Sequence, residues 1–136
     1  MRLDSTCSPR FLSFETMFER DPPVTPSLRA QFMCQSIEDI VAAVYGVDAA
    51  RFRVAPARPR SVLFPRRVAV YLLHVIGGLQ FTEIGRLYGL DRRTIALACA
   101  AVENARDDVA CDKLLMRLES AAVVCCERCL MTAPER

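Results

Sequence analysis

The sequence predicts an all-α fold: a compact helical domain with an embedded helix-turn-helix, preceded by a flexible N-terminal segment. Ala, Val and Leu dominate its apolar residues and Trp is absent, a composition that suits closely packed helices. From position 27 onwards, apolar residues recur at helical spacing in segments separated by glycine or proline. A chain of 136 residues has room for one core. We therefore expect one domain over residues 27–130 and a frayed tail over residues 131–136.

The N-terminal segment, residues 1–26, is expected to be a flexible arm. It contains four prolines, which interrupt helices, and shows no helical period. Within it, residues 11–18 (FLSFETMF) are rich enough in apolar side chains to form a docking peptide, although a loosely packed arm is the favoured interpretation. The start lacks the apolar stretch of a secretory signal, and no apolar run reaches the roughly 20 residues of a membrane span. We therefore expect a cytoplasmic protein with mostly reduced cysteines.

The first helix is predicted from Ser27, a suitable N-cap, to Gly46, a suitable residue after the last turn. Asp48 can cap a further short turn. The apolar residues on one face of this helix are expected to be Phe32, Ile37, Ile40, Val41, Val44 and Tyr45.

The segment that follows carries two arginines between prolines. Pro56 and Pro59 exclude a helix and hold Arg58 and Arg60 in an extended conformation, which fits either an arm that contacts a ligand or a plain interhelical linker. The next helix is predicted to begin at Ser61 or at the Phe64-Pro65 pair and to end before two glycines. Its expected core residues are Val68, Leu72, Val75 and Ile76, and its lone histidine, His74, is predicted to be structural.

Two short helices are then predicted around a glycine turn. Residues 82–88 form the first, with Gly85 allowing a neighbouring segment to approach closely, and Gly89-Leu90 forms the turn. Asp91 is predicted to cap the second helix. The inner residues of the pair are expected to be Phe81, Ile84, Leu87, Ile95, Ala98, Cys99 and Val102, and the outer residues of the second helix Arg92, Arg93, Ala96, Ala100 and Glu103.

A last helix is predicted over residues 111–130. Its core residues are expected to be Leu114, Leu115, Leu118, Ala121, Ala122 and Cys125. The helix ends in CCERC, with thiols at Cys125, Cys126 and Cys129, but a second ligand pair for zinc is missing from the sequence, and Cys111 would serve only if the fold brought it close. We therefore favour packing thiols over a metal or redox site.

Positive charge is concentrated in the middle third of the chain. Residues 51–93 contain nine arginines and two acidic residues, whereas the rest of the chain is acidic. Arginine presents a planar fork of donors that suits phosphate and guanine. A solvated arginine-rich surface is the alternative interpretation.

These motifs together resemble the C-terminal DNA-binding domain of the bacterial chromosomal replication initiator DnaA. The resemblance runs from about Ser36 to Glu119 and is carried by RPRSVLFPRRVAVYLL, LQFTEIGRLYG and DRRTIALACAAVE. It implies a helical domain that binds short double-stranded DNA sites. The nucleotide-binding loop GxxxxGK[ST] of the initiator is missing from this sequence, so a stand-alone relative is expected. The turn is one residue shorter than in the family, and arginines replace its His and first Thr, so a different base preference is expected.

The resemblance also implies DNA contacts at particular residues. Arg58 matches the arginine that enters the minor groove, with Arg60, Arg66 and Thr82 near the phosphates. The start of the major-groove helix matches Asp91, Arg92, Arg93 and Thr94.

We therefore expect a nucleoid-associated DNA binder that acts in replication initiation or transcription, with double-stranded DNA and replication-initiation proteins as partners. No catalytic set emerges, so we expect neither an enzyme nor a cofactor, a metal, a small-molecule substrate or a membrane partner. A protein-interaction regulator that reuses the fold without specific DNA binding is the alternative.

Overall fold

The computed structural model describes residues 26–53 and 60–132, with side chains up to Arg128. Over these ranges every regular element is helical, which confirms the predicted fold class. The elements are α2 (Leu28–Tyr45), the 3-10 turns η1 (Ala49–Arg51) and η2 (Arg60–Val62), α3 (Leu63–Val75), α4 (Phe81–Tyr88), α5 (Arg92–Ala105) and α6 (Val109–Thr132). The predicted N-terminal arm, except Pro26, and Arg58 lie outside the described residues.

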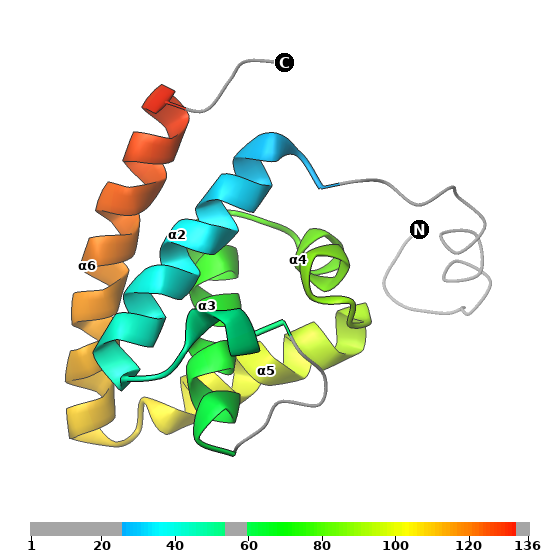
Figure 1. Cartoon of the computed structure of the whole chain (residues 1–136). Helices are drawn as coiled ribbons and strands as arrows, with labels where there is room; N and C mark the ends of the chain where they lie inside the picture. Colours follow the sequence, from blue (N-terminus) through cyan, green and yellow to red (C-terminus); the bar gives the residue numbers. More distant parts are fainter. Residues whose placement is uncertain (1–25, 54–59, 133–136) are drawn as a thin grey trace.

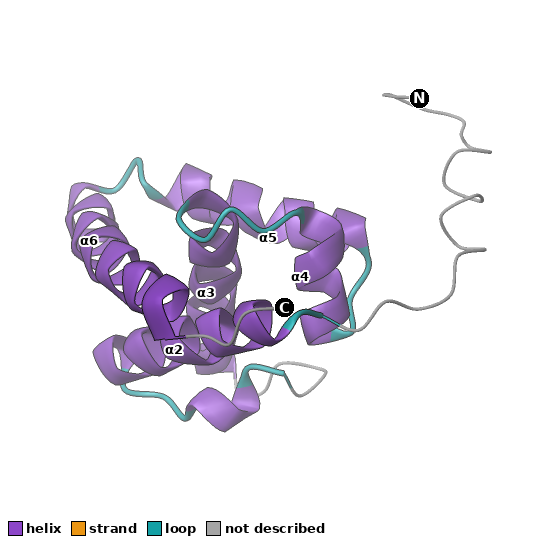
Figure 2. Cartoon of the chain, turned by 90° about the horizontal axis from the view of Figure 1, so that it is seen from above, coloured by secondary structure: helices purple, strands orange, loops and turns teal. Residues whose placement is uncertain are grey.

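Helix α3 is the centre of the domain (Figure 1). It packs against α2 and α5, while α6 packs along α2 and α4 packs against α5. In the perpendicular view of Figure 2, α6 and α4 again lie on opposite sides of α3. All these helices contribute side chains to one core, whose largest fully buried members are Phe52, Ile37, Leu72, Leu73, Ile84, Ile95, Leu115 and Leu118.

The helix starts follow the local signals in the sequence. The Oγ of Ser27 accepts a hydrogen bond from the Ala30 amide at 3.0 Å, and Gly46 follows the last turn of α2 as its C-cap, as predicted. The Asp48 carboxylate accepts from the Ala50 amide at 3.0 Å and caps η1. Helix α3 begins just before Pro65, which occupies its first turn, where a missing amide hydrogen costs nothing.

Several predicted core positions were wrong. Phe32 and Val44 of α2 are 45% and 48% exposed, because the buried face of α2 is centred on Ile37 and turned towards both α3 and α6. The residues that are buried on α2 without having been predicted are Ala30, Met33, Cys34, Glu38 and Ala42. Val75 is also exposed, at the last turn of α3.

The inner face of α6 also differs by one position at its C-terminal end. Leu115, Leu118 and Ala122 are buried as predicted, but the next buried residue is Cys126, whereas Cys125 is half-buried. A helical spacing of four residues leads from Ala122 to Cys126, so Cys125 lies at the edge of the interface. The side chain of Cys129 is outside the described residues.

An arginine after α5 joins three helices. Its Nε donates to Asp112 at 2.6 Å, and its Nη1 donates to Glu119 at 2.6 Å and to the Tyr71 hydroxyl at 3.1 Å. This residue, Arg106, lies at the C-terminal end of α5, and its pKa is raised chiefly by the bonds to Glu119 and Asp112. The contacts fix the short connection between α5 and α6 against α3.

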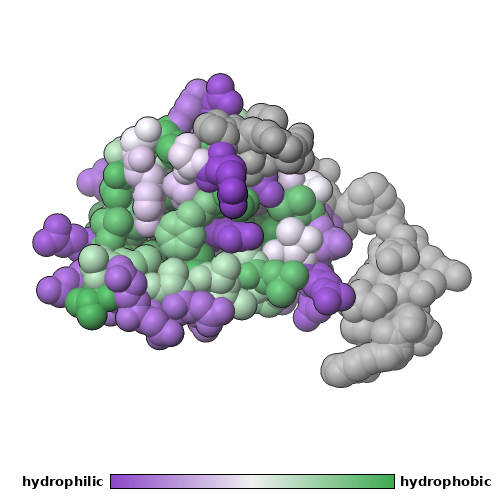
Figure 3. Space-filling model, turned by 90° about the horizontal axis from the view of Figure 1, so that it is seen from below, coloured by the Kyte–Doolittle hydropathy of each residue, from purple (hydrophilic) through white to green (hydrophobic). Residues whose placement is uncertain are grey.

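Large apolar side chains also reach the surface. In Figure 3, which views the molecule from below, green apolar atoms are interspersed with purple polar ones. The exposed large apolar residues are Leu28, Phe32, Val44, Val75, Leu97, Val109, Met116, Val123 and Val124. Single exposed apolar residues are ordinary on protein surfaces, so exposure alone does not indicate a binding site.

Candidate nucleic-acid interface

Helices α4 and α5 form a helix-turn-helix with a tightly closed turn. Gly89 ends α4 with φ of 68°, a left-handed conformation that glycine adopts without a Cβ clash. The amide of Leu90 donates to the Gly85 carbonyl at 2.9 Å. A Cβ on Gly85 would lie 2.4 Å from the Leu90 carbonyl oxygen, so a side chain there would push the turn away from α4. Gly85 therefore permits the close approach of the turn at Leu90, as the sequence predicted.

The first turn of α5 presents two arginines to solvent. Asp91 is the N-cap, and its Oδ1 accepts from the Thr94 amide at 2.7 Å. Arg92 and Arg93 are the first two helical residues and are exposed, as is Thr94. Positive side chains at this end oppose the helix dipole, so their placement does not serve the stability of α5. They lie where a helix that enters the major groove would meet base edges.

The Asp91 carboxylate keeps its charge in this setting. The Thr94 amide and hydroxyl, and then the charge of Arg93, hold the pKa of Asp91 below its usual range. Its contribution to stability is therefore complete above the pKa that the carboxyl has in the unfolded chain, and it is lost as the pH falls through the lower folded value.

The start of α4 is held by contacts from two sides. The Gln80 amide donates to the Glu83 carboxylate at 3.0 Å. The Nδ1 of His74 lies 2.9 Å from the Leu79 carbonyl oxygen, and its ring packs on Phe81 with 4.3 Å between centroids. These contacts give His74 the structural role that was predicted. They also place the half-buried Thr82 in the first turn of α4.

Two of the predicted upstream arginines lie within the described residues. Arg60 is exposed at the start of η2, where the described chain resumes. Arg66 is half-buried on α3, and its Nη1 donates to the Phe52 carbonyl at 3.4 Å. Arg66 therefore contacts the chain on the other side of residues 54–59, the segment that contains Arg58.

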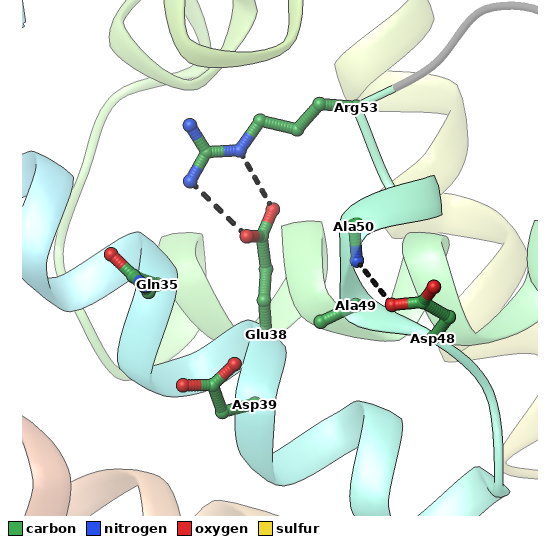
Figure 4. A pocket seen from close by; sticks show the side chains of 7 residues that line it. All are labelled: Gln35, Glu38, Asp39, Asp48, Ala49, Ala50 and Arg53. Atoms are coloured by element: carbon green, nitrogen blue, oxygen red, sulfur yellow. Dashed lines mark hydrogen bonds and ion pairs between the residues drawn. The ribbon is translucent and has the colours of Figure 1, made fainter.

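A buried ion pair between Glu38 of α2 and Arg53, which was not predicted from the sequence, lies against the end of α4. Glu38 of α2 is 5% exposed, and Arg53 donates to both of its carboxylate oxygens, at 3.0 and 3.1 Å (Figure 4). The Tyr88 hydroxyl, at the end of α4, donates to the same carboxylate at 2.7 Å. The sequence signal was an acidic residue among apolar ones on the inner face of a predicted helix, which calls for a buried cationic partner.

The two groups that donate to the Glu38 carboxylate are a neutral phenol and a guanidinium cation at neutral pH. Burial is the main cause that raises the pKa of Tyr88, so its hydroxyl keeps its proton. The bonds to Glu38 raise the pKa of Arg53, whose guanidinium also lies 5.8 Å from the Tyr88 ring centroid. The cluster is therefore one ion pair with a neutral phenol that donates to it. It connects α2, α4 and the residue that precedes the 54–59 segment.

Helices α2 to α5 follow a known family pattern. Residues 34–102, just over half of the 136-residue chain, match the model of the bacterial DnaA protein helix-turn-helix. The chain belongs to this family. No curated protein and no solved structure matches it. Membership of the DnaA helix-turn-helix family supports DNA binding, and the match spans α2 from Cys34, the Glu38–Arg53 pair and α5 up to Val102.

A pocket of about 490 Å³ lies beside the ion pair of this DnaA-family domain (Figure 4). Its lining residues are Gln35, Glu38, Asp39, Asp48, Ala49, Ala50 and Arg53. Glu38 binds Arg53 and Asp48 caps Ala50, so two of its three carboxylates already have structural partners. The acidic lining does not suit a phosphate, so this pocket is not a candidate for DNA contact.

The cysteines of the DnaA-family domain do not gather into a metal site within the described residues, where no group of three or more potential metal ligands occurs. Cys126 packs in the core. Nor does any described helix have the length and apolar character required to cross a membrane.

Two buried thiols should resist alkylation in the folded protein. Burial, and then the charge of Glu38, raises the pKa of Cys34 to about 12, and burial, and then Glu103, raises that of Cys99 to about 11. At about pH 8, iodoacetamide should modify both roughly tenfold more slowly, or slower still, in the folded than in the urea-unfolded chain. Peptide mass spectrometry measures the rates, and equal rates in the two states would contradict the structure.

Proposed function

We propose that the protein binds double-stranded DNA with sequence preference through its helix-turn-helix. In this arrangement α5 enters the major groove, Arg92 and Arg93 contact guanine edges, and Asp91 and Thr94 complete the first turn. Arg58 enters the minor groove, and Arg60, Arg66 and Thr82 contact phosphates. The observation that carries the proposal is the exposed pair of arginines at the capped start of α5, in a chain of the DnaA helix-turn-helix family.

The test compares the natural chain with a triple variant in which Arg58, Arg92 and Arg93 are replaced by alanine. Both are incubated with fragmented genomic DNA, and the bound fragments are sequenced. The natural chain should enrich a small set of sites, and the triple variant should not. Equal enrichment by both proteins would refute the proposal. Genome-wide binding of the tagged protein would then show whether the sites lie at replication origins or promoters, and so whether it acts in the nucleoid on replication initiation or transcription.

Replacing Arg66 with alanine should weaken binding to all DNA sequences by the same factor. One lost phosphate contact should lower the slope of log Kd against log salt by about 0.9. Fluorescence anisotropy over a salt series measures this slope. Since Arg66 also contacts the Phe52 carbonyl, a thermal melt must show that the variant is folded. Arg117→Ala, an exposed arginine on α6, is the matched control and should leave the slope unchanged.

A protein-interaction role is the second candidate. It is favoured by exposed apolar residues on α6, outside the family match, where Val109 is 67% and Met116 55% exposed. Partners in replication initiation would then remain bound after nuclease treatment and after the arginine substitutions. Loss of all partners on nuclease treatment would remove this candidate.

A further inference from the structure

Leu97 is an apolar side chain on the part of α5 that points away from the core. It is 59% exposed, whereas Ile95, Cys99 and Val102 on the opposite side of the helix are buried. Arg93 lies one turn before Leu97 on the same line of the helix, and Ala100 lies one turn after it. Leu97 therefore continues the line that Arg93 begins.

The fold does not account for this leucine. Among the described residues of α4 and α5, it is the single large apolar residue that is mostly exposed. Its neighbours Ala96, which is half-buried, and Ala100, which is exposed, have small side chains, so neither one covers the Leu97 side chain. Four residues of helix advance about 6 Å along the axis, roughly the rise of two base pairs. A helix that places Arg93 on one base would bring Leu97 to a neighbouring one.

We propose that Leu97 contacts the 5-methyl group of a pyrimidine in the major groove, which in unmodified DNA is the methyl group of thymine. This inference rests on the proposed DNA binding. The thymine methyl is the one apolar group that a base pair presents in the major groove, and it is contacted by apolar side chains. The site should therefore contain a thymine close to the bases that Arg92 and Arg93 contact. 5-Methylcytosine offers the same methyl group.

The experiment first selects binding duplexes from a library with 20 randomised base pairs, using the natural full-length chain. Each thymine of the winning duplex is then replaced singly by deoxyuridine, which removes only the methyl group. One position should weaken binding about fourfold, the value expected for one methyl group removed from water. At that position, 5-methylcytosine should bind more tightly than cytosine.

The same duplexes are then measured with three variants. The Leu97→Ala variant should bind the thymine duplex and the deoxyuridine duplex with equal affinity. The Leu97→Met variant, which keeps an apolar side chain, should retain the difference in affinity. Met116→Ala, an equally exposed apolar residue on α6, should behave like the natural chain. Leu97 is exposed, so its alanine variant should melt within about 3 °C of the natural chain.

The outcomes separate this inference from the function on which it rests. If Leu97→Ala retains the full deoxyuridine penalty, or if no thymine shows one, the inference is overturned while DNA binding stands. Leu97 would then be free for a protein contact. If the selection enriches no duplex with the natural chain, both the inference and the proposed function fall.

Discussion

Replacing both Arg92 and Arg93 with alanine should remove most of the preference for a selected duplex over a scrambled one. Each arginine–guanine contact is worth about 1–3 kcal/mol of discrimination, so the affinity ratio should fall at least about 30-fold. Anisotropy titrations with both duplexes at one salt concentration measure the ratio. The residual affinity should be similar for the two sequences, because phosphate contacts do not distinguish bases.

Loss of folding cannot explain this result. Arg92 and Arg93 oppose the dipole of α5, so their removal should leave the melting temperature unchanged or raise it. Arg117→Ala again serves as the control for a lost positive charge and should keep the ratio of the natural chain. A double variant that is folded and still discriminates between the duplexes would contradict the assignment of α5 as the reading helix.

Replacing Arg53 with alanine should lower the free energy of unfolding by about 2–3 kcal/mol. Removal of one partner from a buried ion pair costs about 3–5 kcal/mol, and the expected loss is smaller here because the Arg53 side chain is 38% exposed. The loss arises because the Glu38 side chain, 6% exposed, would then keep the Tyr88 hydroxyl but no cationic partner among the described residues. Urea unfolding followed by circular dichroism measures the change.

Two further variants test the origin of this loss. Arg53→Lys keeps the charge but not the two-pronged contact, so its stability should lie between those of the alanine variant and the natural chain. Arg117→Ala removes an exposed arginine on α6 and should change stability much less. If Arg53→Ala and Arg117→Ala were equally stable, the Glu38–Arg53 pair would have no structural role.

The sequence predicted the helix ends and the helix-turn-helix because these depend on short-range interactions. Ser27, Asp48 and Asp91 each cap a helical element through an amide two or three residues away. Gly85 was likewise recognisable, because the turn that it accommodates begins four residues later.

Features that depend on distant residues could not be predicted in the same way. The partners of Glu38 are Arg53 and Tyr88, 15 and 50 positions away, and no local pattern identifies them. The exposure of Phe32 depends on how α2 rotates between α3 and α6, which the period of the helix alone does not determine. The roles in DNA binding of the eight residues from Arg58 to Thr94 remain predictions.

The closed turn between α4 and α5 should affect the rate of the proposed DNA binding. Because the Leu90 amide donates to the Gly85 carbonyl and a Cβ on Gly85 would not fit, we expect the turn to hold α5 against α4 without help from DNA. The residues of α4 and α5 would then lose their conformational entropy when the chain folds, and they would lose little more on contact with DNA. Association should therefore be limited by diffusion and charge attraction, with no slow rearrangement of α4 against α5.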